Sequence, residues 1–264
     1  MNYKYAISYL VIILFVLSNL TNAENFSKGQ ISLKNLLDDS LQKQLEILEG
    51  IKKQNLDYKT FEILARLLTH SKNIQVKREI IAILAKDKNI SIDKKAPLLL
   101  NALRKEITNP TTLKYPEGSY MPGSEYIKRQ LQFSLEKLGY KCIPYIKNAY
   151  QNATGEYKDR LVILLAVFKI PNTFESLLKI SKNSPDGFVR SLAVRSLGIL
   201  ENKKAVPALE TALNDPFSTI SNRCIITNDP AFNKIYPVRE EAFRALKILG
   251  VKVKRSGNKF WVVE

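Results

Sequence analysis

Residues 189–213 read VRSLAVRSLGILENKKAVPALETAL, and this stretch decides the fold. Apolar residues recur at helical spacing in its first half; they are Val189, Leu192, Ala193, Leu197 and Leu200. After a polar break, a second apolar-faced segment begins near Pro207. Proline suits the first turn of a helix, because an N–H group there has no intrahelical partner and the ring fixes φ near its helical value. The stretch therefore predicts two helices joined by a short turn, which is a helical hairpin.

The hairpin pattern recurs with a period of about 31 residues. Residues 127–150, IKRQLQFSLEKLGYKCIPYIKNAY, repeat both segments, with Ile127 in the place of Val189 and Pro144 in the place of Pro207. Residues 157–180, YKDRLVILLAVFKIPNTFESLLKI, supply the same pair halfway between. Weaker copies cover residues 31–69 and 76–99, the latter with Ala96-Pro97-Leu98-Leu99 opening its second segment, and residues 238–250 repeat the first segment alone.

A helical hairpin cannot bury its apolar stripe alone, so neighbouring hairpins are expected to stack around a continuous core. The sequence therefore predicts an all-α fold, an α-solenoid of stacked hairpins over residues 24–250. Two segments rich in Pro, Gly, Asn and Ser, residues 107–125 and 216–237, interrupt the period at equivalent places and are interpreted as insertions. Residues 251–264 alternate apolar and charged side chains around Ser256-Gly257-Asn258, which predicts a C-terminal β-hairpin cap.

The repeat unit resembles the HEAT-like repeats also found in phycocyanobilin-lyase-type proteins. The segments VRSLAVRSLGIL and AVPALETALNDP, within Asp186 to Asp215, carry the resemblance. It implies an α-solenoid that serves as a binding or scaffolding surface, with a lyase-like or other enzyme accessory role as the alternative. It also implies a ladder between repeats, made by an Asp before the first helix and an Arg just inside it. The matching positions are Asp186, Arg190 and Arg239, with Lys77 and Lys128 replacing Arg in two units.

The N-terminal segment has the features of a secretory signal peptide. Lys4 is followed by an uncharged stretch over residues 5–20, and Thr21-Asn22-Ala23 ends it with a small residue. The fully apolar part, residues 10–17, is shorter than the roughly 20 residues that cross a bilayer, which argues against the alternative of a membrane anchor. We therefore expect cleavage near Ala23, a periplasmic or secreted protein, and no transmembrane segment after removal of residues 1–23.

The formal net charge is +16, and +15 remains without residues 1–23, whose only charge is Lys4. Such an excess favours anionic partners. Export disfavours nucleic acid, so a protein or an anionic cell-envelope component is the expected partner; the alternative is that dispersed lysines only solvate the helices. The oligomeric state stays open. So does a disulfide between Cys142 and Cys224, which the repeat pattern places more than two repeats apart.

The sequence offers little for catalysis. His70 is the single histidine, so a histidine triad or a multi-histidine metal site cannot be built. No glycine-rich phosphate loop or nucleophile elbow is present, and the carboxylates are interpreted as parts of solvated helix faces. We therefore predict no catalytic residue, no cofactor and no metal site, and a protein that works by binding.

The binding surface is expected on the concave face and on the inserted loops, because insertions in a solenoid project from one face, which is often the face that binds. Basic and aromatic side chains there are the candidates: Tyr115, Tyr120 and Tyr126 in or beside the first insertion, Lys147, Tyr150, Lys179 and Lys182 on second helices, and Arg223 in the second insertion. The alternative is that the insertion aromatics, which also include Phe217, Phe232 and Tyr236, pack on the repeat edges. Trp261, the only tryptophan, is expected to cover the last repeat.

Overall fold

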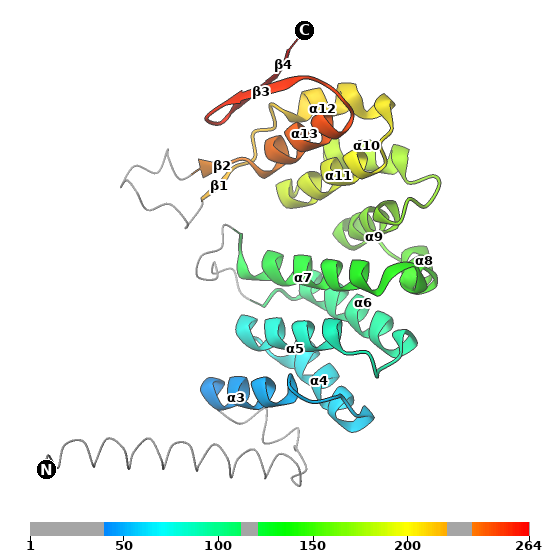
Figure 1. Ribbon diagram of the computed structural model, residues 1–264, viewed down its shortest axis with the longest axis vertical. Helices are drawn as coiled ribbons and strands as arrows, with labels where there is room; N and C mark the ends of the chain where they lie inside the picture. The colour runs from blue at the N-terminus through cyan, green and yellow to red at the C-terminus, as the bar shows by residue number, and fades with distance from the viewer. Residues whose placement is uncertain (1–39, 112–120, 221–233, 264) are drawn as a thin grey trace, which may run out of the picture.

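The computed structural model describes residues 40–111, 121–220 and 234–263. The predicted signal segment and most of both insertions lie outside these ranges. The described residues form an elongated stack of helices running from the N-terminal to the C-terminal end (Figure 1). This confirms the predicted α-solenoid. No helix in the described ranges combines the length and the apolar character needed to cross a bilayer.

The helices form two layers. The first helices of the hairpins are α3 (Leu41–Ile51), α5 (Ile74–Lys86), α7 (Gly123–Leu138), α9 (Gly155–Val167) and α11 (Gly187–Ile199), and α13 (Pro237–Ile248) ends their row. The second helices are α4 (Tyr58–His70), α6 (Ile92–Thr108), α8 (Ile143–Gln151), α10 (Phe174–Asn183) and α12 (Val206–Ala212), with short 3₁₀ turns η1 (Gly139–Cys142) and η2 (Lys203–Ala205) before α8 and α12. Each second helix packs against the first helix of the following hairpin.

The helix starts follow local chemistry. Asn73 and Asp186 cap α5 and α11, where their side chains accept hydrogen bonds from backbone N–H groups of the first turn. Pro144 and Pro207 lie in the first turns of α8 and α12, as the sequence predicts. Pro97 differs, because α6 already begins at Ile92 and the ring lies inside the helix. There it removes one intrahelical hydrogen bond on an exposed face, where water can satisfy the freed carbonyl.

The core divides into two clusters of buried side chains that meet on α9. Leu161 and Leu164 belong to the cluster that runs from α3 to α9, and Val162 and Ile163 to the cluster that runs from α9 to the C-terminal hairpin. Residues 160–166 of α9 are all buried, so this helix has no wide solvated face, unlike an amphipathic surface helix. Helix α9 is therefore the joint between the two halves of the stack.

The described ends of the insertions are short and packed. Helix α6 extends through Thr108 and α7 begins at Gly123, so the first insertion is shorter than its predicted range. The second is closed at its base by β1 (Thr219–Ile220) pairing antiparallel with β2 (Lys234–Ile235). Phe217 is half-buried, and its ring lies 4.9 Å from that of Phe188 in an edge-to-face contact. Tyr236 is half-buried under the Arg239 guanidinium, 4.1 Å from the ring centroid.

The chain ends in the predicted hairpin, with β3 (Val253–Ser256) antiparallel to β4 (Lys259–Val262). Gly257 has φ 56°, which suits the first position of a two-residue turn between twisted strands. The expectation that Trp261 covers the last repeat is wrong. Phe260 does so, 7% exposed and 5.6 Å from the ring of Phe243 in α13, whereas Trp261 is 43% exposed. Neighbouring residues of a strand face opposite sides of the sheet, so a shift of one residue in which positions face inward would exchange the buried aromatic.

Candidate functional site

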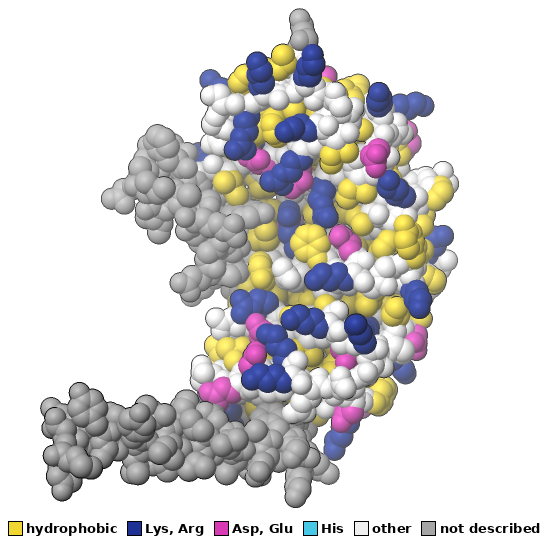
Figure 2. All heavy atoms as spheres, in the orientation of Figure 1, with side chains coloured by type: hydrophobic (Ala, Val, Ile, Leu, Met, Phe, Trp, Pro, Cys, Tyr) yellow, Lys and Arg dark blue, Asp and Glu magenta, His cyan; other side chains and the backbone are white. Residues whose placement is uncertain are grey.

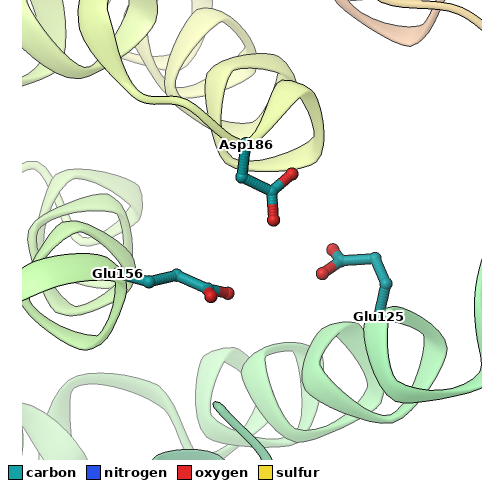
Figure 3. Close-up of side chains that lie close together, drawn as sticks. All are labelled: Glu125, Glu156 and Asp186. Carbon is teal, nitrogen blue, oxygen red and sulfur yellow. The ribbon is translucent and has the colours of Figure 1, made fainter. Parts of the chain in front are cut away.

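Three carboxylates from three neighbouring first helices converge at the joint. Glu125 lies in the first turn of α7, Glu156 in the first turn of α9, and Asp186 caps α11 (Figure 3). One oxygen of each lies within 4.8 Å of the others. The positive end of a helix dipole stabilises an acidic side chain in each of these positions. The stacking of parallel first helices thus brings their acidic ends together.

Arg160 of α9 joins this cluster and is fully buried. Its guanidinium donates to Glu156 at 2.7 Å, to Glu125 at 2.5 Å and to the Oε1 atom of Gln132 at 2.6 Å. Burial alone would lower the pKa of Arg160, but the negative charges of Glu125 and Glu156 raise it above its ordinary value. The arginine is therefore a fixed positive charge inside the stack.

Lys128 and Arg129 of α7 complete the set of cations. The Nζ atom of Lys128 lies 2.8 Å from Glu156 and 3.7 Å from Glu125. Arg129 contacts Glu125 at 3.3 Å and donates to the hydroxyl of Ser191 in α11 at 2.9 Å. Burial raises the pKa of Glu156, but Arg160 and Lys128 outweigh it and hold that pKa below its ordinary value.

This charge balance argues against a metal ion at the three carboxylates. Three positive side chains, Arg160, Lys128 and Arg129, already contact two of them. The third, Asp186, accepts the N-cap hydrogen bond of α11 and adds its negative charge to the field at Arg160. A divalent cation prefers carboxylate oxygens that are free to coordinate it, and here it would add charge to a neutralised cluster. The geometry fits an internal bridge that ties three hairpins together.

Two further ion pairs, one buried and one half-buried, lie at the same end of the first helices, and they revise the ladder implied by the family resemblance. Lys77 donates to Glu106 of α6 at 2.6 Å, and Arg190 contacts Asp215, after α12, at 2.8 Å. Arg190 therefore pairs within its own hairpin, while Asp186 faces the preceding one. Glu106 and Asp215 also accept from the first backbone N–H groups of the two insertions, at residues 111 and 217, so each pair anchors an insertion.

The predicted binding residues on the second helices are accessible. Lys147 of α8 and both Lys179 and Lys182 of α10 are exposed, whereas Tyr150 is half-buried against both core clusters. The ring of Tyr150 also receives the Lys158 ammonium of α9, 5.2 Å from its centroid. Tyr150 is held at the joint by these contacts. We call Lys147, Tyr150, Lys179 and Lys182 of the second helices, together with Lys158 of the neighbouring α9, the second-helix patch.

The other predicted binding residues are either half-buried or outside the described residues. Tyr126 is half-buried against the first core cluster, so little of its ring is available to a partner. Tyr115, Tyr120, Phe232 and Arg223 lie outside the described residues. Cys224 does too, so the question whether it pairs with Cys142 stays open. The thiol of Cys142 is buried and donates to backbone carbonyls of residues 135 and 139. Burial raises its pKa to about 11.

Contacts between α7 and α11 were missed by the sequence analysis. Arg195 of α11 stacks on Phe133 of α7 at 5.3 Å, and Arg129 of α7 lies over Phe188 of α11 at 5.8 Å. The hydrogen bond from Arg129 to Ser191 joins residues 62 positions apart, which is two repeat periods. Arg129 and Ser191 occupy equivalent positions in alternate repeats, but the sequence spacing does not by itself show that these two helices touch.

The architecture and this repeated charge pairing define a helical repeat protein of the α-solenoid class. Residues 189–215 match the family model described as PBS lyase HEAT-like repeat. The matched segment covers α11 and α12, so this hairpin is similar to a HEAT-like repeat, as the sequence resemblance predicted, and the match fits the helical solenoid. A comparison with curated proteins found no match.

Proposed function

We propose that the chain is an exported HEAT-like scaffold that binds an acidic protein or an anionic cell-envelope component and performs no catalysis of its own. The observation that supports it is the second-helix patch: Lys158 lies over the ring of Tyr150 at the joint between the two cores, and Lys147, Lys179 and Lys182 are exposed on α8 and α10. Helical repeat stacks typically use such extended faces for binding.

The patch combines rigidity with positive charge. Tyr150 is packed against both core clusters, so the ring is held in place without a partner. Lys147 and Tyr150 lie one helical turn apart, as do Lys179 and Lys182, so each pair shares a helix face. Lysine ammonium groups around a fixed ring attract anionic groups and offer an apolar contact beside them. The predicted concave face and the inserted loops extend this proposed surface.

The buried charges support a scaffold role better than an enzymatic one. The acidic groups Glu125 and Glu156, which come closest to a catalytic constellation, are neutralised by Arg160 and Lys128 and buried or half-buried between helices. An acid-base catalyst needs a carboxyl group that can exchange a proton with a substrate. These groups hold hairpins together, so the proposed activity lies on the surface.

The first test replaces the patch lysines. A variant carrying Lys147→Gln, Lys179→Gln and Lys182→Gln should lose affinity for an anionic polymer such as poly-glutamate, measured by calorimetry at low salt. Its matched control carries Lys53→Gln, Lys88→Gln and Lys105→Gln, three exposed lysines of the N-terminal hairpins. Both variants have the same net charge, so equal weakening of the two would reject the patch and leave only a diffuse charge effect.

The proposed export has its own test. Expression of the full chain in a bacterial host, followed by N-terminal sequencing of the protein recovered outside the cytoplasm, should give a chain that starts at Glu24. A chain recovered from the cytoplasm with Met1 or Asn2 at its start would reject export, while the binding result above would stand independently.

A further inference from the structure

The C-terminal hairpin has two faces of different chemistry. The register pairs Val253 with Val262 and Arg255 with Phe260, and these pairs share the face that packs on α13. The other pairs, Lys254 with Trp261 and Ser256 with Lys259, share the opposite face. We call this second set, extended by Lys252, the outer hairpin face.

The outer hairpin face holds lysines around a large exposed aromatic ring. Trp261 is 43% exposed, and Lys252, Lys254 and Lys259 are exposed beside it. Lys254 lies directly across the strand pair from Trp261, and Lys259 lies two residues before it on the same strand. Phe260 packs inward, and Arg255 on the same face pairs with Glu240 at 3.2 Å, so these contacts favour the orientation that leaves the indole on the outer face.

The position of the hairpin matters as much as its composition. It lies at the C-terminal end of the stack (Figure 1), beyond α13. At that end, Figure 2 shows hydrophobic side chains with Lys and Arg on both sides. A two-stranded ribbon at the end of the stack presents an exposed face that an extended partner can reach.

We infer that the outer hairpin face docks on an anionic lipid surface. Tryptophan favours the boundary between headgroups and acyl chains, because the ring is apolar and its N–H still reaches polar groups. Lysine extends its apolar stem along the same boundary and keeps the ammonium among the headgroups. Each lysine near an anionic membrane strengthens binding about fivefold, so the three lysines together contribute about a hundredfold.

The single tryptophan makes the test specific, because every change in tryptophan emission reports on residue 261. The full-length chain is titrated with vesicles of phosphatidylcholine alone and of phosphatidylcholine mixed with phosphatidylglycerol. We expect a blue shift of the emission with the anionic vesicles only, reversed by high salt, and quenching by lipids brominated in the upper acyl chain. Unchanged emission overturns the proposal even if the protein sediments with vesicles, since residues 1–23 could then be responsible.

Variants separate the hairpin from general charge. Lys252→Gln, Lys254→Gln and Lys259→Gln together should weaken the anionic-vesicle titration by about a hundredfold. The matched control, Lys105→Gln, Lys141→Gln and Lys203→Gln, removes the same charge elsewhere and should weaken it far less; equal losses overturn the proposal. A blue shift with soluble polyphosphate that equals the shift with vesicles overturns it in favour of a soluble polyanion. This surface is separate from the second-helix patch, so failure here leaves the proposed function standing.

Discussion

The Nη2 atom of Arg160 lies 2.5 Å from the Oε2 atom of Glu125, and both side chains are buried between α7 and α9. This pair joins the two hairpins at the point where the hydrophobic core divides. Removing Arg160 leaves the buried Glu125 with only its longer contacts to Arg129 and Lys128, and breaking a buried ion pair in this way is costly. The expected effects on stability follow from that burial.

Arg160→Met should lower the free energy of unfolding by about 3–5 kcal/mol, because Glu125 loses its shortest buried ionic contact. The comparison is Arg244→Met, which breaks the exposed ion pair of Arg244 with Glu241 on α13 and should cost less than about 1 kcal/mol. Urea titrations of both variants measure the difference. Similar losses in the two would contradict the assigned role of Arg160.

Stability should fall in acid through Glu156. Its pKa is held below the ordinary 4.5, so its contribution is fully present above that pH and is lost as the pH falls through the lowered value. Glu156→Gln should flatten this part of the pH profile of unfolding. Glu210→Gln, a change at an exposed position of α12, should leave the profile unchanged. A Glu156→Gln profile that matches the wild type would show that the carboxylate does not stabilise the joint.

The buried thiol of Cys142 should resist alkylation. Its pKa is raised from 9.0 to about 11, so the native protein holds almost no thiolate at neutral pH. In a Cys224→Ser background, iodoacetamide should modify Cys142 only after unfolding. The same shift predicts that the contribution of Cys142 to stability is constant below about pH 9 and falls between about pH 9 and pH 11. The reason is that the thiol of the unfolded chain releases its proton at lower pH than the buried thiol does. Fast modification of the native protein would contradict this burial.

Close packing of α11 on α13 depends on Gly198. A Cβ atom placed there would lie 2.8 Å from the Cβ of Ala245 and 3.0 Å from its Cα. Gly198→Leu should therefore cost about 1–3 kcal/mol of stability, although leucine favours the helix more than glycine does. Gln151→Leu, at an exposed position of α8, serves as the control and should leave stability nearly unchanged. A stabilised Gly198→Leu variant would mean that the two helices separate easily.

Phe260 faces inward and Trp261 faces outward, so truncating these two adjacent aromatics should change the free energy of unfolding by different amounts. Phe260→Ala should lower the free energy of unfolding by about 3 kcal/mol, because it removes the buried ring that contacts Phe243. Trp261→Ala should change it by less than about 1 kcal/mol, since the ring lies on the outer face. Thermal unfolding followed by circular dichroism at a helical wavelength measures both. The reverse order would place Trp261 in the core after all.

The sequence predicted the stack because its signal is periodic. The spacing of Val189, Ala193 and Leu197, repeated at Ile127 and its successors, specifies a helix face whatever its neighbours do. The choice between Phe260 and Trp261 lacked such a signal. Within β4 and the residue after it, Phe260 shares a face with Val262 and Trp261 shares one with Val263, so this strand alone does not decide which aromatic is buried. Contact with Phe243 decides between them, and that contact depends on the tertiary structure.

The charged joint was beyond sequence reasoning for a related reason. Glu125 falls at the end of a predicted insertion, and a carboxylate there is most simply interpreted as solvated. Its burial depends on α7 beginning two residues earlier, at Gly123, and on α9 carrying Arg160 to meet it. Charges 35 residues apart become partners only through the stacking. By contrast, Lys147, Lys179 and Lys182 were recognisable as exposed because each stands on the polar side of a strongly periodic helix.

Helix α9 is buried on both sides, so both halves of the stack depend on it. A chain severed between α8 and α9 would leave the N-terminal fragment without Leu161 and Leu164, which fill its last groove. The C-terminal fragment would keep α9 but uncover those same leucines to water. Both fragments would expose apolar surface that the intact stack buries, so a cut in this linker should destabilise the protein rather than release two independently stable parts.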